Sequence, residues 1–256
     1  MKMVYVSDVG RVRPVNEDSA WISRLEQGYT IGIVADGMGG HQAGDTASQL
    51  AVETIVQDMV ELAPNLSVQA CGEALKQAIL HANEVVFRKA SEHQEYHNMG
   101  TTVVAVLLSG QNGVVGHIGD SRVYQYRQGG LTQLTEDHSL VNELLKNKQI
   151  SEEEALTHPR RNVLTRALGT DSEVEVDLDQ IVLEAGDILL LCSDGLSNHV
   201  TREQMMLTLG AGDLSLQDRA QHLLQLALNA GGDDNITVAL LENYEEAGPS
   251  IKEWNS

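Results

Sequence analysis

Aromatic residues and cysteine are scarce in this sequence. Phe, Trp and Tyr make up 4 % of its 256 residues, so Leu, Val, Ile and Ala must build the core. The two cysteines, Cys71 and Cys192, lie in a predicted helix and in an apolar run, which is typical of small buried hydrophobic side chains. Two cysteines in a chain of this length exclude a disulfide framework and a cysteine-based zinc site.

Long apolar runs and an excess of positive charge are also missing. No run reaches the roughly 18 apolar residues of a membrane-spanning helix, and the start of the chain indicates a strand and not a signal peptide. Lys and Arg number 17 against 37 Asp and Glu, which gives a formal net charge of −20. A chain this acidic is a poor partner for nucleic acid phosphates and anionic lipid. We therefore expect a cytoplasmic protein that binds neither nucleic acid nor membrane.

The apolar residues that are present, 42 % of the chain, suffice for one sizeable core. Apolar runs bounded by turn residues predict strands at 4–6, 21–22, 31–35, 102–109, 114–118, 122–126, 131–134, 181–183, 188–192 and 236–241. Helices are predicted within 47–59, 68–92 and 214–230, together with a polar helical segment over 139–166. Because hairpins join the strands and long helices lie between the strand runs, we expect antiparallel sheets packed face to face with helices outside. A domain of residues 1–242 is expected, followed by a polar tail of residues 243–256.

Acidic residues recur next to the predicted strands. Strands are followed by Asp36, Asp120 and Asp194, the last strand is preceded by Asp233 and Asp234, and Glu17 and Asp18 lie between two early strands. Strand ends in one core can converge, and convergent carboxylates repel one another unless a cation lies between them. Carboxylate, carbonyl and water oxygens suit Mg²⁺ and Mn²⁺. A single aspartate at such a position is more often a turn or cap residue, but five such positions favour a shared metal site.

Seven short motifs extend this interpretation. They are GRVRPVNED (10–18), VADGMGGH (34–41), MGTT (99–102), GHIGDSR (116–122), LTEDHSL (134–140), SDGL (193–196) and GDDNIT (232–237). The chain resembles the metal-dependent protein phosphatases of type 2C, especially the short bacterial single-domain members, in which these motifs occur in the same order. The resemblance covers residues 5 to about 241. One such motif is weak support, whereas seven in order are strong support.

The resemblance implies an α+β fold, a four-layer α–β–β–α sandwich with a two-metal centre at one end of the β core. By position it implies metal ligands at Glu17, Asp18, Asp36, Gly37, Asp120, Asp194 and Asp234. Asp36 would bridge two Mn²⁺ or Mg²⁺ ions. Asp194 and Asp234 would complete one site, and the Gly37 carbonyl would serve the other, with Glu17 or Asp18 acting directly or through water. Asp120 matches the position that helps to hold a third, weaker ion. Arg13 matches the phosphate-binding arginine, whose planar fork binds phosphate oxygens in a way that a lysine cannot.

Two positions depart from the family pattern. Met38 stands where the animal enzymes carry the histidine that is the proposed general acid, and His41 is the nearest substitute. His41 is equally suited to shaping the glycine-rich loop or capping the next helix, so both interpretations stand. Asn198 replaces an aspartate that supports the third ion, which weakens the expectation of that site. His138 belongs to a family motif and is interpreted as structural.

The implied activity is hydrolysis of phosphoserine and phosphothreonine in proteins by a water that bridges two metal ions. The expected partners are phosphorylated proteins, including a cognate bacterial serine/threonine kinase, and the chain is expected to be a monomer. A hydrolase of a small-molecule phosphoester is the alternative, because the surrounding loops and not the metal centre choose the substrate. A catalytically inactive binding module is disfavoured, since Arg13, Asp36, Asp194 and Asp234 are all present. Residues 139–166 are predicted to form a mobile flap that selects substrates.

Overall fold

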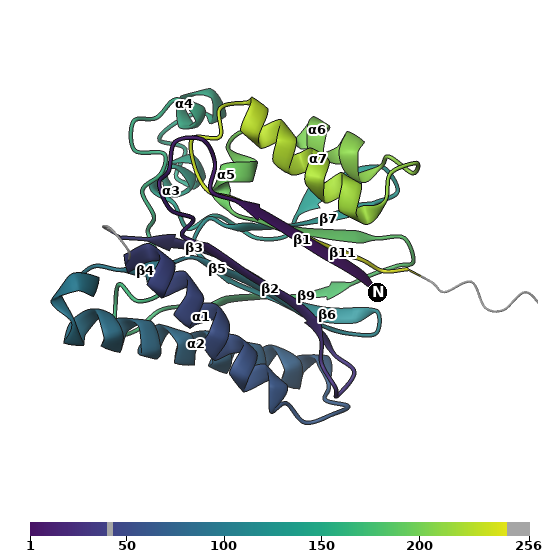
Figure 1. Ribbon diagram of the computed structural model, residues 1–256, viewed down its shortest axis with the longest axis horizontal. Helices are drawn as coiled ribbons and strands as arrows, with labels where there is room; N and C mark the ends of the chain where they lie inside the picture. The colour runs from purple at the N-terminus through teal and green to yellow at the C-terminus, as the bar shows by residue number, and fades with distance from the viewer. Residues whose placement is uncertain (40–42, 245–256) are drawn as a thin grey trace, which may run out of the picture.

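The computed structural model of the chain describes residues 1–39 and 43–244, with two antiparallel sheets lying between two layers of helices (Figure 1). The strand order of the first sheet is β1 (Lys2–Asp8), β11 (Ile236–Glu242), β10 (Ile188–Cys192), β7 (Arg122–Arg127) and β8 (Gly130–Gln133). That of the second sheet is β2 (Asp18–Arg24), β3 (Thr30–Met38), β5 (Val103–Ser109), β6 (Asn112–Ile118) and β9 (Asp177–Val182), and the short β4 (Gly100–Thr101) pairs with the end of β3. The α+β, four-layer α–β–β–α sandwich that the sequence predicts is confirmed.

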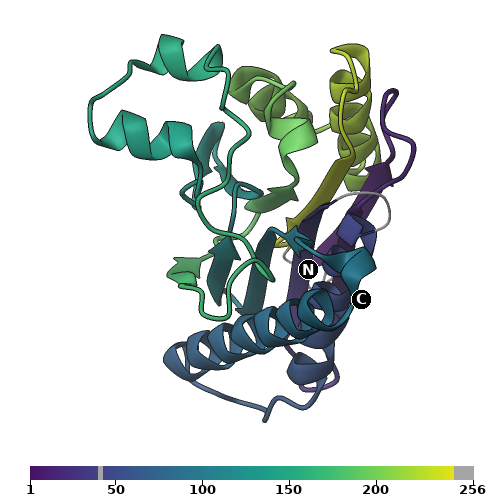
Figure 2. The ribbon, with the colours of Figure 1, turned by 90° about the vertical axis from the view of Figure 1, so that its left-hand side faces the viewer.

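Each sheet is covered by helices on its outer face (Figure 1). The second sheet packs against α1 (Ala43–Val60) and α2 (Val68–Glu92), which is followed by the single turn η1 (Gln94–Tyr96). The first sheet packs against α6 (Arg202–Leu209) and α7 (Leu216–Asn229), with the short α5 (Asp194–Ser197) directly after β10. Two further helices, α3 (Leu140–Lys146) and α4 (Glu152–Leu156), lie apart from both layers (Figure 2). Within the described residues, no helix is both long and apolar enough to cross a bilayer.

The two sheets are buried on both faces, which explains why their central strands are continuous apolar runs. In β10, Leu189 and Leu191 pack in the cluster between the sheets, whereas Ile188, Leu190 and Cys192 pack against α6 and α7. The same alternation divides the residues of β3 between the sheet interface and helices α1 and α2. The core therefore has three layers of apolar contact, and it holds the ends of the central strands in fixed positions.

Some element boundaries differ from those that the sequence predicts. The prediction of helix over 139–166 is wrong after α4, because residues 157–166 form turns that return to pair with Ser139 through Leu164. Strand β3 continues through Gly37 and Met38, which pair with β4, so Asp36 lies inside the strand and not at its end. Strand β9 begins four residues before the predicted start, at Asp177, because polar side chains are tolerated on this edge strand. Helix α6 was not predicted.

Candidate active site

Most of the acidic residues singled out from the sequence converge at one end of the sandwich, whereas Asp233 is exposed and does not line the cavity there. Asp18 begins β2 and lies directly opposite Asp36 of β3 in the strand register. A cavity of about 500 Å³ opens at this end. Its described lining includes Asp36, Asp120, Asp194, Asp234, Glu17, Gly37 and Arg13. The predicted convergence of the strand-end carboxylates is therefore confirmed, whereas their individual roles as metal ligands stay predictions.

Burial and mutual repulsion disfavour the ionised form of these carboxylates. Burial raises the pKa of Asp18 to about 7, and burial followed by repulsion from Asp194 raises the pKa of Asp120 to about 7. The pKa of Asp36 is raised well above its ordinary value by burial and then by repulsion from Asp18 and Asp194. Burial and the charge of Asp234 raise the pKa of Asp194 in the same direction. Such a cluster is stable in its ionised form when cations lie among the oxygens.

Two buried oxygens at this site have no hydrogen-bond partner, Glu17 Oε1 and Asp18 Oδ1. Buried polar atoms without partners are rare in folded proteins and call for a bound group. The backbone around them is also tightly packed, because a Cβ atom on Gly37 would lie 2.0 Å from the Gly44 carbonyl oxygen. The donor set is made of carboxylate and carbonyl oxygens, which are the ligands of hard divalent cations. The residues present therefore fit Mn²⁺ or Mg²⁺.

Arg13 brings a positive charge to the rim of the cavity. Its Nη2 atom lies 2.8 Å from Asp234 Oδ2, and its side chain is 45 % exposed. The other described arginine of the lining, Arg166, forms ion pairs with Asp177 and Glu175. Arg13 is thus the guanidinium group that is placed at the carboxylate cluster and is also accessible to an incoming anion.

Hydrogen-bonding residues hold the acidic side chains in place, and sequence reasoning missed them. The Ser193 hydroxyl donates to Asp18 Oδ2 at 2.7 Å and accepts from the backbone N–H of Thr237 at 3.0 Å. The Asn235 side chain bonds the backbone at Val9, Val15 and Glu17, which ties down the loop that carries Arg13. The motif GDDNIT (232–237) contains this asparagine, but from the sequence it is only a neighbour of Asp234.

Asn198 has a defined contact at the position where the family carries an aspartate. Its Nδ2 donates to Asp194 Oδ2 at 3.1 Å. The neutral amide therefore orients one carboxylate of the cavity without adding a negative charge. His41, the predicted substitute for the missing general acid, lies outside the described residues, whereas Met38 lines the cavity at the end of β3.

The sequence comparison agrees with this geometry. A family model for protein phosphatase 2C matches residues 11–231. The serine/threonine phosphatase stp of Listeria welshimeri is 41 % identical over 242 residues, which cover 94 % of this chain and 96 % of that protein.

Solved structures show the same architecture. The serine/threonine phosphatase PstP/Ppp of Mycobacterium tuberculosis matches with a TM-score of 0.86 at 36 % identity, covering 95 % of this chain and 99 % of that one. The catalytic domain of PstP, solved in complex with two manganese ions, matches with a TM-score of 0.83 at 34 % identity over 95 % of this chain and 98 % of that one. Motifs, fold and site geometry together show that the chain belongs to the protein phosphatase 2C family of metal-dependent serine/threonine phosphatases.

Proposed function

We propose that the chain hydrolyses phosphoserine and phosphothreonine in proteins with two Mn²⁺ or Mg²⁺ ions in its core site, and that a third ion binds more weakly. The observation that supports this most directly is the convergence of Asp36, Asp120, Asp194 and Asp234 in one cavity. Asp18 lies opposite Asp36 in the strand register, and buried oxygens of Glu17 and Asp18 are unpaired. When bound, such ions supply a water nucleophile at neutral pH and compensate the charge of the phosphoryl group.

Each residue of the site has a definite role in this proposal. Asp36 would hold both core ions, Asp194 and Asp234 would complete one site, and the Gly37 carbonyl with Glu17 or Asp18 would complete the other. Asp120 belongs to the weaker site. Arg13 binds the phosphate oxygens through its remaining N–H groups and orients the phosphoryl group. Ser193 and Asn198 keep the carboxylates of Asp18 and Asp194 in position through the hydrogen bonds described above.

The proposed substrates are phosphorylated proteins, including a cognate serine/threonine kinase. The proposed setting is a monomer in the cytoplasm that binds neither nucleic acid nor membrane. We assign the catalytic domain to residues 1–242, the substrate-selecting flap within it to residues 139–166, and a polar tail to residues 243–256. The relatives that are named protein phosphatases match the chain over nearly its whole length, which supports an intact catalytic domain.

Substrate class is tested by the release of phosphate in the presence of Mn²⁺. Phosphothreonine and phosphoserine peptides are expected to be hydrolysed faster than phosphotyrosine peptides and nucleotides, and chelation of the metal is expected to abolish every rate. Faster hydrolysis of nucleotides or sugar phosphates would instead identify a small-molecule phosphoesterase. Measuring the bound ions by equilibrium dialysis, with Mn²⁺ and Mg²⁺ in parallel, tests their number and identity.

A further inference from the structure

His138 joins the turn before Asp120 to the segment that forms another wall of the same cavity. Its backbone N–H donates to the Gly119 carbonyl at 2.9 Å, and its ring Nδ1 accepts from the Gly119 N–H at 3.1 Å. Its own carbonyl accepts from the N–H of Thr165, a residue that lines the cavity. One residue therefore contacts both the Asp120 turn and the returning segment of the flap.

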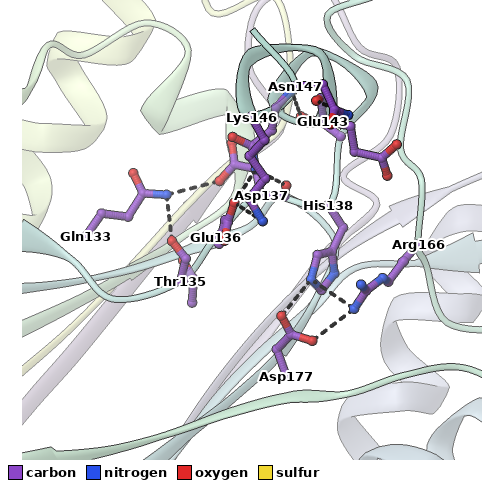
Figure 3. Close-up of polar contacts among 12 residues, drawn as sticks. Gln133, Thr135, Glu136, Asp137, His138, Glu143, Lys146, Asn147, Arg166 and Asp177 are labelled. Atoms are coloured by element: carbon purple, nitrogen blue, oxygen red, sulfur yellow. Dashed lines mark hydrogen bonds and ion pairs between the residues drawn. The ribbon is translucent and has the colours of Figure 1, made fainter.

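The far side of the His138 ring is held by two charged residues (Figure 3). His138 Nε2 lies 3.2 Å from Asp177 Oδ2, and Arg166 Nη1 donates to Asp177 Oδ1 at 2.9 Å. The ring also stacks on His117, with centroids 4.8 Å apart. Since the His138 side chain is 7 % exposed, these contacts leave the ring a single orientation.

The bonding pattern determines which ring nitrogen carries the proton. A backbone N–H can only donate, so His138 Nδ1 must present its lone pair to Gly119. The ring proton then lies on Nε2 and is donated to Asp177. Burial lowers the pKa of His138, which favours this neutral form. Protonation of Nδ1, or the opposite tautomer, would break the bond to Gly119.

The same three side chains, His117, His138 and Asp177, have ligand atoms within 4.8 Å of one another, as a metal site would. Their bonding does not suit a metal. Both His138 nitrogens are engaged, His117 Nε2 lies 2.9 Å from the Glu136 carbonyl oxygen, and Arg166 already supplies a positive charge to Asp177. The two rings are stacked at 16°, so their in-plane lone pairs do not point at one ion.

We propose that His138 is a positioning residue for Asp120: its Nδ1 bond to Gly119 holds the Asp120 carboxylate at a fixed place relative to the cavity wall formed by residues 162–167. This inference rests on the proposed role of Asp120 in the weaker cation site. Gly119 adopts φ +103°, and a Cβ there would lie 2.6 Å from Thr102. The turn is thus confined on one side by Thr102 and on the other by His138.

Two substitutions test the contacts at the two ends of the ring separately. His138→Asn places its amide oxygen near the position of Nδ1 and keeps an acceptor for Gly119, but it does not reach Asp177. His138→Gln reaches towards Asp177 and leaves the Gly119 N–H without a partner. Equilibrium dialysis measures the binding of Mn²⁺ to both variants, to the wild-type protein and to Asp120→Asn. This comparison does not depend on enzymatic activity.

We expect Asp120→Asn to lose the weakest class of Mn²⁺-binding site. His138→Gln is expected to weaken binding to that class of site alone by about tenfold, the low end of the usual loss of metal affinity when a residue that orients a ligand is changed. His138→Asn is expected to stay close to wild type. Wild-type binding by the Gln variant, or equal weakening in both variants, would overturn the proposal. Unchanged binding by Asp120→Asn would overturn the proposed role of Asp120 and this inference with it, a result distinct from failure of the His138 variants alone.

The tautomer provides a test that does not depend on the folding of a variant. Long-range ¹H–¹⁵N correlation NMR of the wild-type protein at neutral pH reports which ring nitrogen is protonated. The proposal requires His138 to be neutral with its proton on Nε2. A charged ring, or a proton on Nδ1, would overturn it.

Discussion

At the scale of single residues, Asp36 is the carboxylate on which the repulsion of the whole cluster acts. Asp18, Asp194, Asp120 and Asp234 all raise its pKa. An amide at this position cannot bridge two cations, so we expect Asp36→Asn to lower kcat for a phosphothreonine peptide by about 100-fold or more. Phosphate release and Mn²⁺ binding are the measurements, with the exposed Asp213→Asn as the matched control. More than a tenth of wild-type activity in Asp36→Asn would refute the bridging role.

Arg13 is expected to act on binding and on chemistry together. Its guanidinium lies at Asp234 and is accessible to phosphate, so its contacts should form in the ground state and persist in the transition state. We expect Arg13→Ala to raise KM and to lower kcat, and Arg13→Lys to recover only part of the loss, because an ammonium group lacks the bidentate fork. Steady-state kinetics with the exposed Arg24→Ala as control test this. An unchanged KM in Arg13→Ala would argue against direct contact with phosphate.

The acidic residues of the site were predictable from the sequence, but most of their partners were not. Asp36 and Asp194 stand next to apolar runs, and that local pattern marks both of them. Ser193 bonds Asp18 across 175 positions of sequence, and no local pattern encodes such a contact. Asn198 departs from the family pattern, and its bond to Asp194 spans only four positions. That bond forms across the single turn of α5, a short helix that the sequence did not predict.

At the scale of elements, the segment 139–166 combines a fixed end with an exposed middle. None of the residues of α3 is buried, whereas the cavity is lined by Asn162, Leu164, Thr165 and Arg166, and Leu164 also pairs with Ser139. We expect replacement of 139–166 by the segment of a relative to change the preference between two phosphopeptides by about tenfold or more. Hydrolysis of p-nitrophenyl phosphate should stay largely intact. Equal losses on peptide and aryl phosphate would contradict a role in recognition.

Long, strongly periodic elements were predicted well, and short ones were not. Helix α2 spans the predicted 68–92, because its apolar residues recur at helical spacing after the N-cap Ser67. Helix α6 has a weak apolar pattern, although the capping box of Thr201 and Gln204 marks its start. Strand β4 has two residues and depends on its pairing with β3 and on the bridge from Thr101 to Leu168. These elements depend on tertiary contacts that periodicity does not report.

At the scale of the whole molecule, the carboxylate cluster should make the stability of the metal-free protein and that of the metal-bound protein change with pH in opposite directions. The pKa values of Asp18 and Asp120 are raised to about 7 in the folded state, against about 4 for an ordinary aspartate. Between these values the folded, metal-free protein binds more protons than the unfolded chain. The contribution of these two aspartates to the stability of the folded state is therefore complete below pH 4 and is lost as the pH rises through 7. The lowered pKa of His138 acts in the opposite direction, but it is a single group.

We therefore expect the Tm of the metal-free protein to fall as the pH is raised from 5 to 8. With saturating Mn²⁺ the trend should reverse, because the cation binds the ionised carboxylates and stabilises the folded state. Thermal unfolding in EDTA and in Mn²⁺ at several pH values measures both curves. Asp120→Asn should flatten the metal-free curve. A metal-free Tm that rises across this range would contradict the clustering of raised carboxylate pKa values.

The position of the last strand has a consequence for biosynthesis. Strand β11 lies between β1 and β10 and pairs with every residue of β1, from Lys2 with Glu242 to Asp8 with Ile236. On the ribosome, β1 emerges long before β11, so it stays without this partner until residues 236–242 have left the exit tunnel. Asp234 and the Asn235 contacts that hold the Arg13 loop arrive at the same moment. A nascent chain should therefore have no phosphatase activity until β11 has left the exit tunnel, and a fragment that ends before β11 should be inactive.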